Sequence, residues 1–139
     1  MTKRFLWDDA YSVQSRVIDE QHKKFFTILN AMERLRKAKK CTPNDLLRVL
    51  KSLTDYAFYH FAIEEDFMER FGYERLEHHR QQHDVFRSEL ATFAERATTE
   101  EARTLLEVIE EYSQGWLISH ILREDRTCIP LFQKMDQLL

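Results

Sequence analysis

Glycine and proline, the residues that most often shape turns and end helices, occur only twice each in this chain of 139 residues. The sequence is rich instead in Leu, Glu, Arg, Lys, Phe and Ala, a composition that favours helices over hairpins. A chain of this length can bury a core without disulfides. We therefore predict an all-α fold in which residues 1–139 form a single domain.

Capping signals divide the chain into an N-terminal extended arm followed by helices. The arm is expected to reach about Ile18, and Asp19 is the expected N-cap of a first helix that ends near Lys40. Apolar residues recur at helical spacing along that helix. Thr42 followed by Pro43 predicts the start of a second helix, which the glycine at position 72 ends.

Two further long helices are expected in the second half of the chain. The third runs from about Glu74 to Ala97, and Thr98 with Glu101 three residues later has the form of a capping box that opens the fourth. Pro130 lies beyond the expected end of that helix, and the tail LFQKMDQLL is predicted to form a short fifth helix. Four long helices joined by short loops favour an antiparallel up-down-up-down four-helix bundle.

Charge and hydropathy narrow the classes of partner. The formal net charge is −3, and acidic and basic residues are interspersed, so no basic surface for nucleic acid is predicted. No apolar run reaches membrane-spanning length, and the first ten residues lack the apolar core of a signal peptide, so we expect a soluble, cytoplasmic protein without a membrane span. Cys41 and Cys128 form no CxxC motif and are expected to be free thiols.

Five of the six histidines recur with two carboxylates at spacings that suit a metal site inside a bundle. Residues four apart share one face of a helix, so His60 with Glu64, and His79 with His83, can each converge on one metal ion. The full set of candidate metal ligands is His22, His60, Glu64, His79, His83, His120 and Asp125.

The last pair fits an ideal helix less well. His120 and Asp125 are five residues apart, which is about 140° around the helix, so spacing alone favours Glu124 as the partner of His120. A side chain that reaches sideways to a second metal, or a local distortion of the helix, would bring Asp125 in instead.

The alternative interpretation of each histidine is structural. A single buried histidine is more often a hydrogen-bonded core residue than a metal ligand. A set of five with two carboxylates, however, would leave many buried polar groups without partners unless metal ions satisfied them together. His78 points about 100° away from its neighbour His79 and is expected at the surface. Glu65, Asp66 and Glu124 are expected to be solvated or to support the ligands.

These motifs together resemble the single-domain bacterial hemerythrins, or bacteriohemerythrins, along the whole chain. The resemblance rests on Trp7, DEQH at 19–22, HFAIEE at 60–65, HRQQHDVF at 79–86 and WLISHILRED at 116–125. It implies a non-haem site of two iron ions joined by a bridging oxo or hydroxo group. The implied ligands are His79, His83 and His120 on one iron, His22 and His60 on the other, and Glu64 and Asp125 as bridges. The resemblance thus favours Asp125 over Glu124.

Imidazole and carboxylate are suitable ligands for iron. The implied function is reversible binding of dioxygen, for storage, delivery or sensing, at the iron that has two histidines and therefore one open position. An oxygen-consuming enzyme is a candidate recipient, and a monomer or weak homo-oligomer is expected.

Two other classes of function remain open. One is a di-iron redox enzyme of the peroxidase or oxidase kind, or an iron-handling protein. Ferritin-like enzymes use carboxylate-rich sets with Glu-x-x-His motifs, which this chain does not share. The other is a metal-free interaction module, which would require the histidines to cluster by accident.

Aromatic residues are expected to surround the candidate ligands. Phe26, Phe86 and Trp116 each lie three or four residues from a candidate ligand and are predicted to pack beside it. We hypothesise that some of these rings keep water away from bound dioxygen.

Overall fold

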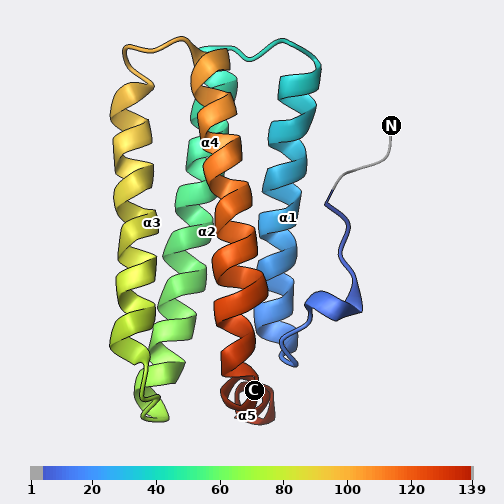
Figure 1. The fold of residues 1–139 in the computed structure, drawn as a ribbon, viewed down its shortest axis with the longest axis vertical. Coiled ribbons are helices and arrows are strands. Elements are labelled where there is room, and N and C mark those ends of the chain that lie inside the picture. Colours follow the sequence, from blue (N-terminus) through green and yellow to red (C-terminus); the bar gives the residue numbers. More distant parts are fainter. Residues whose placement is uncertain (1–4, 139) are drawn as a thin grey trace.

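The chain forms an antiparallel bundle of four long helices in the computed structural model, which describes residues 5–138 (Figure 1). The bounds are α1 Arg16–Lys37, α2 Pro43–Arg70, α3 Leu76–Arg96, α4 Ala102–Trp116 and α5 Ile129–Leu138. A π-helix (Leu117–Glu124) and a 3-10 turn (Asp125–Cys128) join α4 to α5, and a further 3-10 turn (Asp9–Tyr11) lies in the arm. The described residues contain no strand, so the predicted all-α bundle is confirmed.

The helices run alternately up and down (Figure 1). α1 packs against α2 and α4, and α3 packs against α2 and α4, which leaves α2 and α4 at opposite corners of the bundle. α5 lies across the lower end, where it contacts α1 (Figure 1). The short fifth helix expected in the tail is therefore present.

The first helix begins earlier than predicted. Its N-cap is Ser15, whose hydroxyl accepts a hydrogen bond from the Ile18 amide at 3.3 Å. Asp19 fixes the arm instead, because its carboxylate accepts hydrogen bonds from the Ser12 hydroxyl at 2.6 Å and from the amide of residue 13 at 2.9 Å. The helix also ends at Lys37 rather than near residue 40.

The helix starts predicted at Thr42 and Thr98 have different outcomes. At the start of α2, the Thr42 hydroxyl accepts from the Asp45 amide and the Asp45 carboxylate accepts from the Thr42 amide, so the second helix begins as expected. The box expected before α4 does not form. The Thr98 hydroxyl donates to the Glu95 carbonyl at 2.7 Å, and α4 starts after Glu101 without a side-chain cap.

The remaining boundaries follow ordinary backbone rules. Gly72 has a φ of 63°, a conformation that glycine adopts at little cost, and it follows the end of α2. The third helix begins at Leu76, two residues later than expected, and ends at Arg96. Pro130 lies beyond the fourth helix, as expected, and in the first turn of α5, where no backbone N–H is needed.

The arm is tied to the outside of α1. The Asn30 side chain donates to the Phe5 carbonyl at 2.8 Å and accepts from the Phe5 amide at 3.1 Å. Trp7 and Tyr11 both pack their rings against Phe26, with centroids 5.6 and 5.4 Å apart. Phe26 therefore serves the junction between arm and helix, whereas Phe25 faces the core.

The hydrophobic interior has two parts. The larger cluster fills most of the bundle and includes Phe25, Phe61 and Phe86, and the smaller one, around Met68 and Phe132, lies at the end that α5 closes. The candidate metal ligands lie near the border of the two clusters, where they form a buried polar layer.

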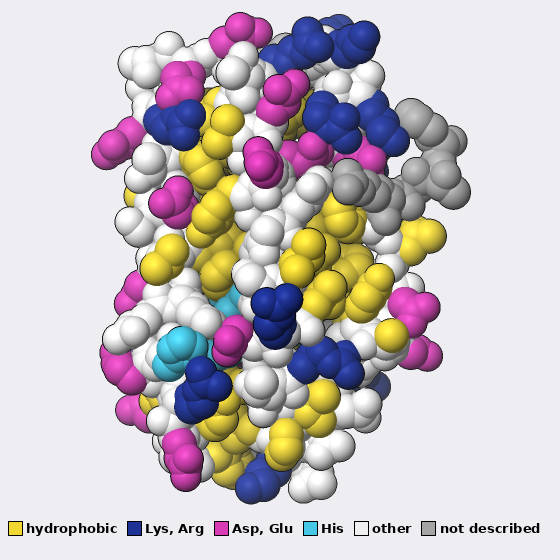
Figure 2. Space-filling model, in the orientation of Figure 1, with side chains coloured by type: hydrophobic (Ala, Val, Ile, Leu, Met, Phe, Trp, Pro, Cys, Tyr) yellow, Lys and Arg dark blue, Asp and Glu magenta, His cyan; other side chains and the backbone are white. Residues whose placement is uncertain are grey.

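The surface has no dominant sign of charge. Acidic and basic side chains are interspersed over the face shown in Figure 2. No helix within residues 5–138 is long and apolar enough to cross a membrane. Cys41 and Cys128 are both free thiols, as predicted.

Candidate metal centre

The bundle brings all seven candidate ligands into one buried layer, where each is at most 2% exposed. α1 contributes one histidine, α2 a histidine and a glutamate, α3 two histidines, and the segment after α4 the last two residues. In that order they are His22, His60, Glu64, His79, His83, His120 and Asp125.

The donor atoms form two overlapping groups. In the first, ligand atoms of Glu64, His79, His83 and His120 lie within 4.8 Å of one another. In the second, the same limit joins His22, His60, Glu64 and Asp125. Glu64 belongs to both groups, and its Oε1 lies 3.3 Å from His60 Nε2 and 3.2 Å from His83 Nε2.

Asp125 also reaches both groups. Its Oδ2 lies 2.9 Å from His22 Nε2, and its Oδ1 lies 3.1 Å from His79 Nε2 and 3.2 Å from His120 Nε2. The layer therefore holds two carboxylates that each span both positions, with three histidines on one side and two on the other.

A π-helix explains how residues five apart share a face. The Asp125 amide donates to the His120 carbonyl, a bond between residues i and i−5 that widens each turn. Glu124, the partner that an ideal helix would favour, lies outside the layer, and its carboxylate is 3.9 Å from Nε2 of the exposed His78. The structure thus brings Asp125, and not Glu124, to the other candidate ligands.

Hydrogen bonds on the outer ring nitrogens orient three of the histidines. Nδ1 of each donates to an oxygen: His60 to Gln21 at 2.5 Å, His83 to Glu65 at 2.6 Å and His120 to Gln82 at 2.9 Å. Because these oxygens accept, the proton lies on Nδ1 and the Nε2 lone pair faces the interior. Such a tautomer is the one that a metal requires.

Gln21 and Gln82 were not singled out by sequence analysis. Each immediately precedes a candidate histidine and supports a histidine of the following helix, so a QH pair at 21–22 and again at 82–83 was the available signal. Glu65 supports His83 and is held in turn by Arg87 at 2.9 Å, which agrees with the supporting role expected of it.

Several polar atoms in the layer have no hydrogen-bond partner among the described residues. They include His60 Nε2, both oxygens of Glu64 and Asp125 Oδ1, all fully buried. Nε2 atoms of His83 and His120 also face each other at 3.2 Å. Each unsatisfied buried group costs about 1–3 kcal/mol. Positive ions bound between these nitrogen and oxygen atoms would satisfy them together, so the donor set fits two iron ions.

Burial and charge separate the histidine pKa values. Burial lowers the pKa of His60 to about 3, so its ring is neutral. Burial also opposes protonation of His79, but the nearby carboxylates of Asp125 and Glu64 outweigh it and raise the pKa to about 10. Burial alone would raise the pKa of Asp125, yet His120 and the other histidines hold it well below its usual value. The layer therefore keeps its carboxylates ionised.

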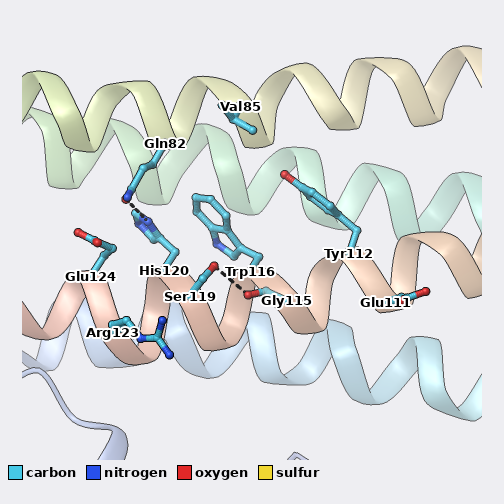
Figure 3. Close-up of a pocket in the computed structure, with 10 residues that line it drawn as sticks. All are labelled: Gln82, Val85, Glu111, Tyr112, Gly115, Trp116, Ser119, His120, Arg123 and Glu124. Carbon is cyan, nitrogen blue, oxygen red and sulfur yellow. Dashed lines mark hydrogen bonds between the residues drawn. The ribbon is translucent and has the colours of Figure 1, made fainter.

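Aromatic rings stack on the candidate ligands from one side. Phe61 stacks on His83 with centroids 3.8 Å apart, and Trp116 stacks on His120 at 4.1 Å, as predicted for the tryptophan. A groove of about 530 Å³ between α3 and α4 has Gln82, Trp116 and His120 among its lining residues (Figure 3). Phe86 packs on Trp116, with ring centroids 4.6 Å apart. Phe26 packs instead on Trp7 and Tyr11 of the arm.

Comparison with known proteins identifies the family. Residues 13–132 match the model of the hemerythrin HHE cation binding domain. The chain belongs to the hemerythrin family. Curated relatives in this family include the bacteriohemerythrin of Clostridium acetobutylicum, 28% identical over 127 residues that cover 90% of this chain and 98% of that protein.

More distant organisms carry similar proteins. A hemerythrin-like protein of Naegleria gruberi is 26% identical, with 87% of each chain covered. The crystal structure of a hemerythrin mutant superimposes with a TM-score of 0.79 over 95% of this chain and 99% of that one, at 22% identity. This last match supports the fold. Together the matches support a bacteriohemerythrin-like protein with a metal-capable cluster of histidines and carboxylates.

Proposed function

We propose that this hemerythrin-family chain holds two iron ions in its buried layer and binds dioxygen there reversibly, for storage, delivery or sensing. The observation that supports the proposal most is the pair of four-atom groups that share Glu64. A histidine with a purely structural role would not require a second group of ligand atoms. A site for one zinc ion would not require two carboxylates that each span two metal positions.

Iron at this centre would supply the electrons that dioxygen takes up on binding and returns on release. The chain's own residues would hold the two iron ions. His79, His83 and His120 surround one position, and His22 and His60 surround the other, with the carboxylates of Glu64 and Asp125 between them. The side with two histidines has fewer protein donors, so it is where a small external ligand has room to bind.

The surroundings suit a reversible process. Gln21, Glu65 and Gln82 fix the orientation of three rings, so little rearrangement is needed when a ligand arrives or leaves. Rings of Phe61 and Trp116 cover the histidines and limit the entry of water. Exclusion of water would slow the protonation and release of a reduced oxygen ligand, a loss that would carry the electrons away, leave the iron oxidised and end reversibility.

The direct test is an absorption spectrum of iron-loaded protein that has been reduced without air, then exposed to air, then deoxygenated. A colourless reduced form that gains a charge-transfer band in air and loses it again is expected. Irreversible conversion to a ferric form without that band would contradict reversible binding and favour a redox enzyme or an iron-handling protein.

A further inference from the structure

Two hydrogen-bonding atoms interrupt the apolar rings that cover the metal centre: the Tyr56 hydroxyl and the Trp116 indole nitrogen. The two residues are 6% and 7% exposed, and both polar atoms are fully buried without a hydrogen-bond partner in the described part of the chain. The other rings around Tyr56 are phenylalanines, at positions 25, 61 and 86. A buried hydroxyl without a partner is unfavourable, so it calls for an explanation.

Both residues lie directly against candidate ligands. Tyr56 is one turn before His60 on α2, and their rings stack with centroids 5.0 Å apart and planes 22° apart. Trp116 is one turn before His120, with its ring 4.1 Å away and 14° from parallel. His60 belongs to one metal group and His120 to the other. The tyrosine and the tryptophan therefore cover both metal positions from the same side.

Tyr56 and Trp116 share a neighbour inside the bundle, because both rings contact Phe61, with centroids 6.0 and 5.7 Å away. They lie on α2 and α4, which are at opposite corners, and in Figure 1 one of these helices lies behind the other, between α1 and α3. Burial and then the charges of Asp125 and Glu64 raise the pKa of Tyr56 well above its usual value. The phenol therefore keeps its proton.

An indole N–H can only donate, whereas a phenol can accept one hydrogen bond and donate another. The Tyr56 hydroxyl has no partner among the described residues, so its own proton is free to donate. Such a donor favours an acceptor that carries negative charge, because charged acceptors form the stronger hydrogen bonds.

We propose that Tyr56 donates a hydrogen bond to small anionic ligands bound at the metal centre. This inference rests on the proposed function, since the ligand must first have iron to bind. Tyr56 then determines ligand specificity: it favours small ligands that hold negative charge on a terminal atom over neutral ligands of the same size.

The test uses azide as the probe and the oxidised, iron-loaded protein. Tyr56→Phe should weaken azide binding on the order of 10- to 100-fold, as expected for one hydrogen bond to a charged acceptor, while iron content stays equal to that of the wild type. Tyr59→Phe is the matched control, because Tyr59 is 65% exposed and its loss should leave azide affinity unchanged.

Two further measurements separate a ligand donor from a structural hydroxyl. The azide stretching frequency of the wild-type adduct should shift between H₂O and D₂O, and this shift should disappear in Tyr56→Phe but persist in Trp116→Phe. The denaturation midpoint of the metal-free Tyr56→Phe protein should equal or exceed that of the wild type, because no protein partner is lost.

Unchanged azide affinity in an iron-loaded Tyr56→Phe protein would overturn the role of Tyr56 and leave the proposed function intact. An azide stretch insensitive to D₂O in the wild type, or a lower denaturation midpoint in the variant, would overturn it as well. A wild-type chain that holds no iron would overturn both the proposed function and this inference.

Discussion

Each histidine of the metal centre has two ring nitrogens, and the contact made by the outer one determines what the inner one can do. The sequence could predict which residues face the centre, because helical spacing and the family motifs both identify them. It could not predict the acceptors for His60 and His120, because Gln21 and Gln82 lie on other helices. Tyr56 and Phe61 escaped notice for a different reason, because they are aromatic residues that look like ordinary core.

Replacing one of these acceptors should weaken the centre without removing a ligand. Gln82→Leu leaves Nδ1 of His120 without its partner, so its ring is free to turn, and a loss of metal affinity of about 10- to 100-fold is expected. Gln81→Leu is the matched control, since Gln81 is exposed. Metal titration of both variants measures the effect, and equal affinities would show that the amide does not position the ring.

Proton release upon metal binding tests the charge balance of the layer. His79, with a pKa raised to about 10, is protonated at neutral pH and must lose its proton to bind a metal, whereas His60, with a pKa of about 3, is already neutral. Metal affinity should therefore rise as pH increases from 7 towards 10. Calorimetry in buffers of different ionisation enthalpy should detect proton release at pH 7.5, from His79 and in part from His83, whose pKa the carboxylates also raise. Binding that is independent of pH and releases no proton would refute this charge balance.

At the scale of elements, capping signals located the start of α2 and its end near Gly72, and they were wrong where another hydrogen bond competed locally. Thr42 is the N-cap that its sequence predicts, whereas the Thr98 hydroxyl donates to the preceding helix. Asp19 looked like a cap, but Ser15 takes that role and Asp19 holds the arm. Helical spacing could not reveal the π-helix after α4, because it assumes an ideal α-helix, and only the family motif indicated Asp125.

The π-helix amounts to one extra residue in a helix, so its removal should be tolerated. Deletion of Arg123, which is exposed, would bring His120 and the following aspartate to a four-residue spacing that shares a face on an α-helix. The variant is expected to keep two irons, as measured by metal analysis. Deletion of the exposed Glu107, within regular α4, should rotate the rest of the helix by about 100° and abolish binding. Loss of iron in both deletions would show that the wider turn is required.

At the scale of the whole molecule, the metal layer separates two hydrophobic clusters and joins α1, α2, α3 and the segment after α4. The sequence could predict this bundle because few glycines and prolines, helical periodicity and short loops all favour it. Metal ions at the shared layer would hold four segments together, so metal binding and folding should be linked.

Removing the metal should therefore lower stability. A metal at 100 times its dissociation constant stabilises the folded state by about 2.7 kcal/mol, so chelation should lower the melting temperature by roughly 5–10 °C. His60→Ala should abolish this dependence, whereas His78→Ala, at an exposed position, should preserve it. Thermal unfolding with and without chelator measures both, and an equal response in the two variants would argue against a role for His60.

The most direct test of a two-metal centre is anomalous diffraction at the iron absorption edge from crystals of iron-loaded protein. Two neighbouring peaks are expected in the buried layer, one beside His79, His83 and His120 and the other beside His22 and His60, with Glu64 between them. A single peak, or iron bound only at the surface, would contradict the two-metal centre.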